Sequence, residues 1–392
     1  MTTGIAAGGD DATQRPLHVA ICGGGRTGHL NAVLFKQMAG VKVSLLTRRR
    51  EVIARHREGQ MLTAILPDQS LLSAHLDAVS EDPADVVADA DVVLITVPAH
   101  ARPGLLREIA PHLRSTGPVY VGAIPGFCGF DWLAEKALQG QPNAVIWGMK
   151  DVPHTAYDLK PGVSVRMGGP KSTLYIGTHA RESDAARDEL RAHLGRIYTA
   201  PVELLSHYLE ITLTPGNPIM HSSVVYGLVG PYGQWHDKTF DAPVCWWTDC
   251  TELGAYFLER SDEESQALCK AIEQRLELTL SSVKPLKQEI IEAYGDQIRD
   301  PASMLSVLRT NQAYDAIEAP LVPAPGGAGY TIDTQSRAFH EDVAYGLSLL
   351  VAMAGRLKVP VPHIAEIFHW NVSYMNGLRG SALDYFPERW PA

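Results

Sequence analysis

Residues 17–28 read LHVAICGGGRTG, and this stretch decides the fold. Its first six residues form a short apolar run after a proline, which predicts a buried β-strand. Glycines follow at once in the spacing Gly-x-Gly-x-x-Gly, and residues 29–39 then have the pattern of a helix that ends at Gly40. A strand, a glycine-rich turn and a helix in this order predict the start of a Rossmann-type dinucleotide-binding domain.

The glycine-rich turn has the composition that a pyrophosphate site needs. Gly23 permits the tight turn, Gly25 lets the backbone approach the phosphates, and Gly28 lets the helix pack closely on the strand. The positive end of the helix faces the phosphates. Arg26 and Thr27 stand in the same turn, where Arg26 could add a phosphate contact. A glycine-rich turn of some other α/β fold is the competing interpretation, and the flanking strand and helix argue against it.

The end of the second apolar run, residues 41–46, indicates which dinucleotide is bound. An NAD enzyme usually carries an acidic residue there, which binds the ribose 2′-hydroxyl. This chain instead has Thr47, Arg48, Arg49 and Arg50, and arginine forks suit a 2′-phosphate. We therefore expect NADPH as the cofactor. NADH is the alternative if these arginines only form a solvated helix start.

Apolar runs alternate with helical patterns along the whole first half of the chain. Such runs predict a parallel sheet covered on both faces, here a doubly wound α/β domain over residues 16–205. The run 91–97 ends at the cofactor crevice, so Val97 and Pro98 are expected to contact the cofactor, whereas His100 is expected to be an ordinary turn residue. The expected strands are 41–46, 91–97 and 119–123, and the expected helices are 51–58 and 104–113.

The second half of the chain has a different character. Helical periods dominate, as in residues 262–283 and 340–357, and strand patterns nearly vanish. This predicts a mostly α-helical domain over residues 206–392. Residues 319–329 are rich in proline and glycine, and we expect them to form an active-site or interface loop.

Size and composition limit the partners. The 392 residues suit two domains, and 45% hydrophobic with 20% charged residues is the balance of a globular protein. The net charge of −10 disfavours nucleic acid and anionic membranes as partners. No apolar run approaches the roughly 18 residues of a membrane span. Residues 1–15 lack the order of a secretory signal and are expected to form a short disordered tail.

The cysteines predict a cytoplasmic protein. There are five of them, an odd number without a CxxC pair, which fits buried thiols in a reducing compartment. We see no spacing of metal ligands, and a homodimer is compatible with the sequence.

Two segments of the second half carry the residue types of a catalytic site. Residues 214–221 read TPGNPIMH, and residues 336–343 read SRAFHEDV. Arg337 and Glu341 are four positions apart, so they share a helix face if the helix already runs there.

Together these motifs resemble the opine dehydrogenases, including the octopine and nopaline enzymes. The resemblance covers residues 17–371: the glycine fingerprint, Asn-Pro-x-x-His, Arg-x-x-x-Glu-Asp, and a helix near Val-Pro-x-Pro. It implies a Rossmann domain and an α-helical domain with the active site in the cleft between them. It further implies that His221 is catalytic, that Asp342 orients it, that Arg337 binds a substrate carboxylate, and that Asn217 contacts substrate.

The reaction of that family suits these residue types. A keto acid and an amine condense to an imine, which is protonated and then reduced by hydride. Imidazole exchanges protons near neutral pH, a buried carboxylate fixes its tautomer, and an arginine fork holds an α-carboxylate. The expected substrates are an α-keto acid such as pyruvate and an amino acid or other amine. A packed or capping histidine is the competing interpretation of His221.

One segment departs from the octopine enzymes. Residues 147–154 read WGMKDVPH and look closer to the dehydrogenases that complete opine-type metallophores. Asp151 is therefore expected to bind the amine, with help from His154, unless it only forms a turn. The neighbouring aromatic pair Trp246 and Trp247 could line an amine pocket, but aromatic clusters more often form core.

Two other functions compete with this interpretation. A reductase of the ketopantoate or glycerol-3-phosphate type would need a catalytic lysine in the second domain, and Lys284 and Lys287 lack a matching context. A non-enzymatic NAD(P)-binding sensor would have no use for the histidine, arginine and aspartate that the motifs supply.

Overall fold

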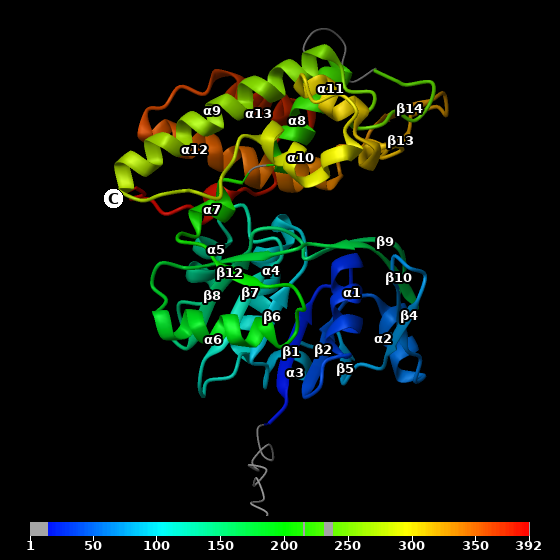
Figure 1. Ribbon diagram of the computed structural model, residues 1–392, viewed down its shortest axis with the longest axis vertical. Coiled ribbons are helices and arrows are strands. Elements are labelled where there is room, and N and C mark those ends of the chain that lie inside the picture. The colour runs from blue at the N-terminus through cyan, green and yellow to red at the C-terminus, as the bar shows by residue number, and fades with distance from the viewer. Residues whose placement is uncertain (1–14, 215, 231–237, 392) are drawn as a thin grey trace, which may run out of the picture.

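The computed structural model describes residues 15–214, 216–230 and 238–391 (Figure 1). A Rossmann-type part and a helical part lie one above the other, and the predicted boundary at residue 205 falls between the last strand of the sheet and the first helix of the helical part. The expected disordered tail, residues 1–15, lies outside the described residues except for Arg15. Within the described residues no helix is long and apolar enough to cross a membrane.

The Rossmann-type part is built on an eight-stranded sheet with the order β12-β11-β8-β7-β6-β1-β2-β5. The predicted parallel pairing is confirmed for β1 with β2 and β6. One pair differs, because β11 runs antiparallel to β8. The strands are β1 (Leu17–Cys22), β2 (Val41–Leu46), β5 (Ala78–Ser80), β6 (Val92–Ile95), β7 (Val119–Ala123), β8 (Ala144–Met149), β11 (Leu174–Thr178) and β12 (Val202–Leu204).

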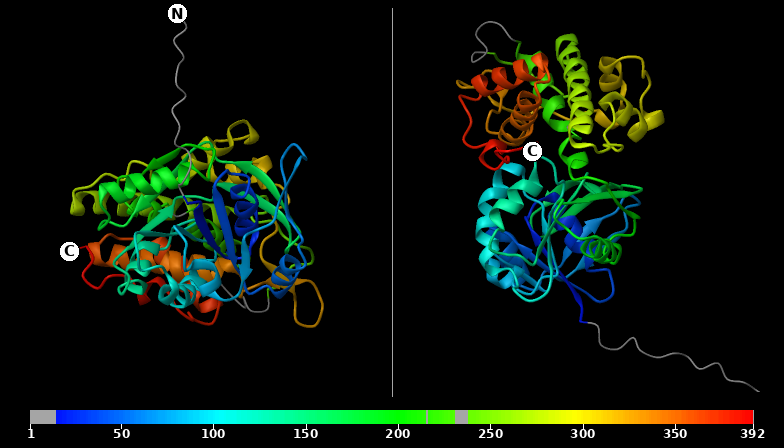
Figure 2. Two further views of the ribbon diagram at one scale, coloured as in Figure 1. Left: turned by 90° about the horizontal axis from the view of Figure 1, so that it is seen from below. Right: turned by 90° about the vertical axis from the view of Figure 1, so that its left-hand side faces the viewer.

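Helices cover both faces of this sheet (Figure 2). Alternate residues of β1 point to opposite faces, so Ile21 packs with Leu30 of α1 and Leu190 of α6, while Cys22 packs with Leu106 of α4 and Leu133 of α5. The predicted first helix starts three residues earlier than expected, directly after the glycine-rich turn. The helices are α1 (Arg26–Phe35), α2 (Arg50–Arg57), α3 (Pro83–Val87), α4 (Arg102–Ile109), α5 (Phe130–Ala137) and α6 (Asp184–Gly195).

A second sheet, with the order β4-β3-β10-β9, was not predicted. Its strands are only partly buried, as in β3, where buried and partly buried residues alternate, so they lack the continuous apolar runs of the main sheet. His29 of α1 connects this sheet to the glycine-rich turn that follows β1. Its Nδ1 lies 3.0 Å from Gly25 O and its Nε2 accepts the Gly162 N–H at 3.0 Å. The strands are β3 (Leu62–Ile65), β4 (Leu71–Ala74), β9 (His154–Lys160) and β10 (Ser164–Pro170).

The second part is mostly helical, as predicted. The expected helix 262–283 is α9, which begins ten residues earlier, where Thr251 Oγ1 accepts the Gly254 N–H. The expected helix 340–357 consists of a π-helix, η6, followed by α12. The expected loop 319–329 contains β13 (Leu321–Pro323), which pairs with β14 (Tyr330–Ile332). The helices are α7 (Leu209–Thr212), α8 (Gly216–Val229), α9 (Glu252–Leu276), α10 (Leu286–Tyr294), α11 (Met304–Thr310), η6 (Ala338–Leu347), α12 (Ser348–Leu357) and α13 (Pro362–Tyr374).

A single apolar core joins the two parts. It contains Val121 of β7 and Leu106 of α4 from the sheet domain, and Ile219 of α8 and Leu349 of α12 from the helical domain. Helix α8 is buried on nearly every side and packs against α9, α13 and η6. This packing holds the backbone of α8 and η6 in place, and with it the side chains that these two helices carry.

His29 makes the stability of the protein depend on pH. Its side chain is 1% exposed, and burial lowers its pKa to about 4, against about 6.5 in an unfolded chain. Between these values the unfolded state binds a proton that the folded state excludes. The stability that neutral His29 contributes is therefore complete above pH ~6.5 and is lost as the pH falls towards 4, by up to about 1.4 kcal/mol per pH unit.

We expect a His29→Gln variant to lose less unfolding free energy than the wild type between about pH 7.5 and about pH 5, measured by urea titration. His112 is exposed, so a His112→Gln control should follow the wild type. A His29→Gln profile parallel to the wild-type profile would contradict this assignment.

Candidate active site

A cavity of about 1340 Å³ opens at the carboxyl ends of β1, β2 and β6. The helical part closes one side of it through Tyr345, Arg379 and Tyr385. Arg26, Thr27 and Gly28 belong to the first turn of α1 and do not line the cavity. The expected cofactor residues that do line it are Gly23, Gly25, Thr47, Arg48, Arg49, Val97 and Pro98.

The glycine-rich turn has the geometry of a phosphate site. Gly23 has a φ of +138°, and a Cβ on Gly28 would lie 1.9 Å from the Gly23 carbonyl oxygen, so neither position tolerates a side chain. A Cβ on Gly25 would meet nothing within 4 Å, because this residue faces open space at the start of α1. The first turn of α1 contains no acidic residue and its N-cap makes no side-chain hydrogen bond. Backbone N–H groups are therefore free to bind an anion, which fits the pyrophosphate of a dinucleotide.

Charges of both signs surround the end of β2. Arg48 forms an exposed ion pair with Glu108 of α4, and Arg49 Nη1 lies 3.5 Å from Glu51 Oε1. Glu81 also lines the cavity. It follows β5, the strand next to β2, whose Ser80 pairs with Leu46. Glu81 was not predicted, because the sequence places no acid at the end of β2 itself and a neighbouring strand, β5, brings this one to the same corner.

The predicted pair of His221 and Asp342 is present in the structure. His221 Nδ1 on α8 lies 2.8 Å from Asp342 Oδ2 on η6, although 121 residues separate them in the sequence. The Asp342 side chain is 2% exposed and that of His221 is 20% exposed. Burial raises the pKa of Asp342, and the hydrogen bond with His221 opposes this effect. The carboxylate can thus fix one ring nitrogen and leave Nε2 free for a substrate.

Two tryptophans stack on the ring of His221. The ring centroid of Trp246 lies 4.6 Å from that of His221 with an interplanar angle of 26°, and Trp247 lies 5.5 Å away at 20°. Tyr314 then contacts Trp247, and Tyr294 contacts Tyr314. The aromatic pair noted in the sequence is therefore buried and also part of the His221 environment. Stacked indole faces hold the imidazole ring in one orientation.

Arg337 lies at the start of η6 and is held by Glu341. Its Nε donates to Glu341 Oε2 at 2.6 Å and its Nη2 lies 2.5 Å from the same oxygen. The predicted sharing of one helix face is thus confirmed. The Arg337 side chain is 58% exposed, whereas that of Glu341 is 1% exposed. Burial alone would lower the pKa of Arg337, but the charges of Glu341 and Asp342 raise it overall.

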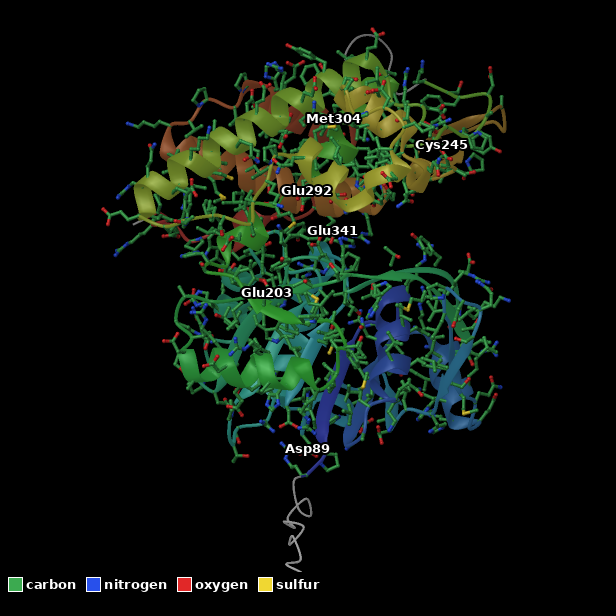
Figure 3. The ribbon with its side chains drawn as sticks, viewed as in Figure 1. Asp89, Glu203, Cys245, Glu292, Met304 and Glu341 are labelled. Carbon is green, nitrogen blue, oxygen red and sulfur yellow. The ribbon has the colours of Figure 1, made fainter. Side chains whose placement is uncertain are left out.

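The two expected substrate residues lie in different places. Asn217 is exposed on α8, one helical turn before His221. Asp151 follows β8 and lines a separate cavity of about 730 Å³, to which Glu203 and Glu292 contribute from the two parts of the molecule (Figure 3). Burial and, to a smaller extent, the negative charge of Asp151 raise the pKa of Tyr294. Tyr294 lies at the end of the aromatic series that begins at His221.

His154 lies in β9 close to Tyr198, with ring centroids 6.1 Å apart. Burial lowers its pKa to about 4. It is therefore neutral near pH 7, and its expected help to Asp151 in binding the amine stays a prediction.

Arg102 is a residue that sequence analysis missed. Its guanidinium is almost fully buried, with 1% exposure, and donates to Val97 O at 3.3 Å, Phe127 O at 3.0 Å and Pro125 O at 2.8 Å. It thereby joins the loops that follow β6 and β7, beside the cofactor cavity. An arginine in the first turn of an amphipathic helix usually faces solvent, so the sequence offers no signal for this role.

Comparison with known proteins supports the same division of the chain. Residues 204–375 match the family described as NAD/NADP octopine/nopaline dehydrogenase, alpha-helical domain. Residues 18–139 match the family described as NAD-dependent glycerol-3-phosphate dehydrogenase N-terminus. The first match is to the domain that carries His221, Arg337 and Asp342, and it separates this chain from the glycerol-3-phosphate enzymes.

Curated relatives cover nearly the whole chain. An uncharacterised protein of Sinorhizobium fredii is 56% identical over 96% of this chain and 99% of its own length. Tauropine dehydrogenase of Arabella iricolor is 27% identical over 90% of both chains. Octopine dehydrogenase of Mizuhopecten yessoensis is 26% identical over 90% of this chain and 89% of its own.

Solved structures share the fold. Octopine dehydrogenase with NADH and L-arginine superimposes with a TM-score of 0.78 at 22% identity, covering 92% of this chain and 90% of that chain. Yersinopine dehydrogenase with NADP⁺ gives a TM-score of 0.65 at 15% identity, with 92% of each chain covered. The expected resemblance is therefore confirmed, and the chain belongs to the opine dehydrogenase family of two-domain NAD(P)-dependent reductases.

Proposed function

We propose that this protein is an NAD(P)H-dependent opine dehydrogenase. It would condense an α-keto acid such as pyruvate with an amino acid or another amine and reduce the resulting imine. The observation that carries this proposal is the hydrogen bond between His221 and the buried Asp342, with Arg337 at the start of the same π-helix.

The proposed reaction assigns a separate task to each of these residues. The keto-acid carbonyl and the amine lose water to form a C=N bond, and the nicotinamide, when bound, supplies the hydride for its carbon. His221 exchanges a proton with the substrate through Nε2, while Asp342 accepts from Nδ1 and stabilises the imidazolium. Arg337 is more than half exposed, so its free N–H groups can bind a substrate carboxylate and orient the imine.

We further propose NADPH as the preferred cofactor. Support comes from Arg48 and Arg49, which line the cavity at the end of β2 and can bind a 2′-phosphate. Glu81 on the same cavity would favour the 2′-hydroxyl of NADH instead, and it repels a phosphate. Glu108 also lines the cavity and pairs with Arg48, so a bound 2′-phosphate would replace this carboxylate as the partner of the guanidinium.

Asp151 is proposed to help select the amine. Its cavity contains charged side chains from both domains, and the series Tyr294, Tyr314 and Trp247 leads from its neighbourhood to His221. A carboxylate at this end of an aromatic series suits an amine substrate with a cationic group.

The function is tested by the wild-type enzyme and a His221→Ala variant together. NADPH oxidation should require both pyruvate and a member of an amino-acid or amine library, and should not occur with either alone. His221→Ala should lower kcat by about 10²–10⁴-fold, because the proton donor is lost, without changing NADPH affinity. Asp342→Asn should act similarly, and the double variant should be little worse than either single one.

His369 is exposed on α13, so His369→Ala is the matched control and should keep wild-type kcat. A wild-type enzyme that reduces a keto acid without any amine would reject the opine reaction. A His221→Ala enzyme with unchanged kcat would reject the assigned catalytic residue.

The cofactor preference is tested with an Arg48→Ala/Arg49→Ala double variant. We expect it to lose about tenfold or more in kcat/KM for NADPH, because two charged contacts to the 2′-phosphate disappear. The value for NADH should change little. Arg57→Ala, at the exposed end of α2, is the control. A wild-type preference for NADH that is abolished in Glu81→Ala would assign the site to NADH instead.

The role of Asp151 is tested by steady-state kinetics of Asp151→Asn. The KM for the amine should rise several-fold, since one charged hydrogen bond is lost, and the KM for pyruvate should stay near its original value. Asp184→Asn, on the exposed start of α6, should change neither. An effect confined to NADPH binding would be incompatible with amine selection.

A further inference from the structure

The carboxylate of Glu341 connects the helical part to the cofactor-binding loop. Figure 3 labels this residue where the two parts of the molecule meet. One oxygen, Oε1, accepts the backbone N–H of Ala99 at 2.7 Å. The other, Oε2, accepts from Arg337 Nε at 2.6 Å. With 1% exposure, this carboxylate is shielded from water, so its hydrogen bonds must come from these two partners.

The π-helix explains how one element serves both partners. In η6 the hydrogen bonds run from residue i to residue i+5, and such segments occur often at functional sites. Glu341 and Asp342 follow Arg337 by four and five positions. The wider turn places both carboxyl groups near the Arg337 guanidinium. Both carboxylates raise the pKa of Arg337. Glu341 then faces the sheet domain and Asp342 faces His221.

The partner on the sheet side belongs to the loop after β6. Ala99 directly follows Val97 and Pro98, which line the cofactor cavity. Arg102 holds the same loop by donating to Val97 O at 3.3 Å. The loop that lines the cofactor cavity is thus fixed by two side chains, Arg102 through Val97 and Glu341 through Ala99.

Another buried carboxylate shows that this arrangement is not required for packing alone. Glu210 is also 1% exposed near the junction of the two parts, and it accepts backbone N–H groups from Ser206, His207 and Ser282. Among the residues that the structure describes, no arginine forms an ion pair with it. Of these two carboxylates, Glu341 alone contacts both the loop after β6, through Ala99, and a cationic side chain, that of Arg337.

We propose that Glu341 is a positioning residue. It couples binding of the cofactor in its cavity to binding of the substrate carboxylate by Arg337. A cofactor that contacts Val97 and Pro98 fixes the Ala99 N–H, which fixes the Glu341 carboxylate and, through it, the guanidinium. The keto acid then binds more tightly to the enzyme that already holds its cofactor, and by linkage the cofactor binds more tightly in the presence of the keto acid. This inference rests on the proposed function of Arg337.

The experiment compares Glu341→Gln with Glu210→Gln. Glutamine keeps the shape and one acceptor oxygen but removes the charge that holds Arg337. Binding of oxamate, an unreactive pyruvate analogue, is measured calorimetrically with and without NADPH. The wild type should bind oxamate about fivefold or more tightly when NADPH is present. Glu341→Gln should lose this ratio and raise the pyruvate KM about tenfold with a smaller change in kcat.

Glu210→Gln should lower the melting temperature yet keep both the oxamate ratio and the pyruvate KM. If Glu341→Gln also lowers only the melting temperature, the coupling role is wrong while the proposed function stands. If the wild type binds no oxamate in either state and oxidises no NADPH with pyruvate and amines, the proposed function itself is wrong. If Glu341→Gln fails to fold, an Ala99→Pro variant replaces it. This variant removes the Ala99 N–H and keeps the Glu341 carboxylate, and it must abolish the NADPH-dependent increase in oxamate affinity.

Discussion

Two adjacent acidic side chains, Glu341 and Asp342, are buried in one helix, and each needs hydrogen-bonding partners there because water cannot reach it. Their partners lie on separate elements: Asp342 binds His221 of α8, and Glu341 binds the loop after β6 and Arg337. The need to satisfy both side chains therefore fixes α8, η6 and the cofactor loop relative to one another. The remaining features of the site follow from this constraint, including the tryptophan stack on His221 and the exposed guanidinium of Arg337.

The sequence predicted those features whose signals are local. The apolar run 17–22 and the glycine spacing after it specify β1, the turn and α1, because each depends on neighbouring residues. The pair of His221 and Asp342 was implied by the resemblance of two motifs to those of the opine dehydrogenases. The second sheet, the contact of Glu341 with Ala99, and the buried Arg102 were not predictable. Each depends on a partner far away in the chain, and a half-buried strand or an arginine in a helix looks the same whether or not such a partner exists.

The cofactor preference illustrates the same limit at one corner of the sheet. The residues after β2 contain arginines and no acid, which by themselves point to a phosphate. Because β5 pairs with β2, the structure adds Glu81 to the same cavity, and α4 adds Glu108 beside Arg48. Neighbouring parallel strands thus bring side chains from segments that are remote in sequence to the same corner of the sheet. The electrostatic potential at the ribose therefore depends on several strands and cannot be inferred from the end of one strand.

The apolar core that runs from β7 and α4 into α8 and α12 has a consequence for how substrates enter. A large hydrophobic interface between domains opposes their separation, since water would have to wet the exposed surface. Full separation of the two parts would therefore carry a cost in exposed apolar surface. Small sliding movements of packed helices or local rearrangement of loops at the rim would admit substrate at a lower cost.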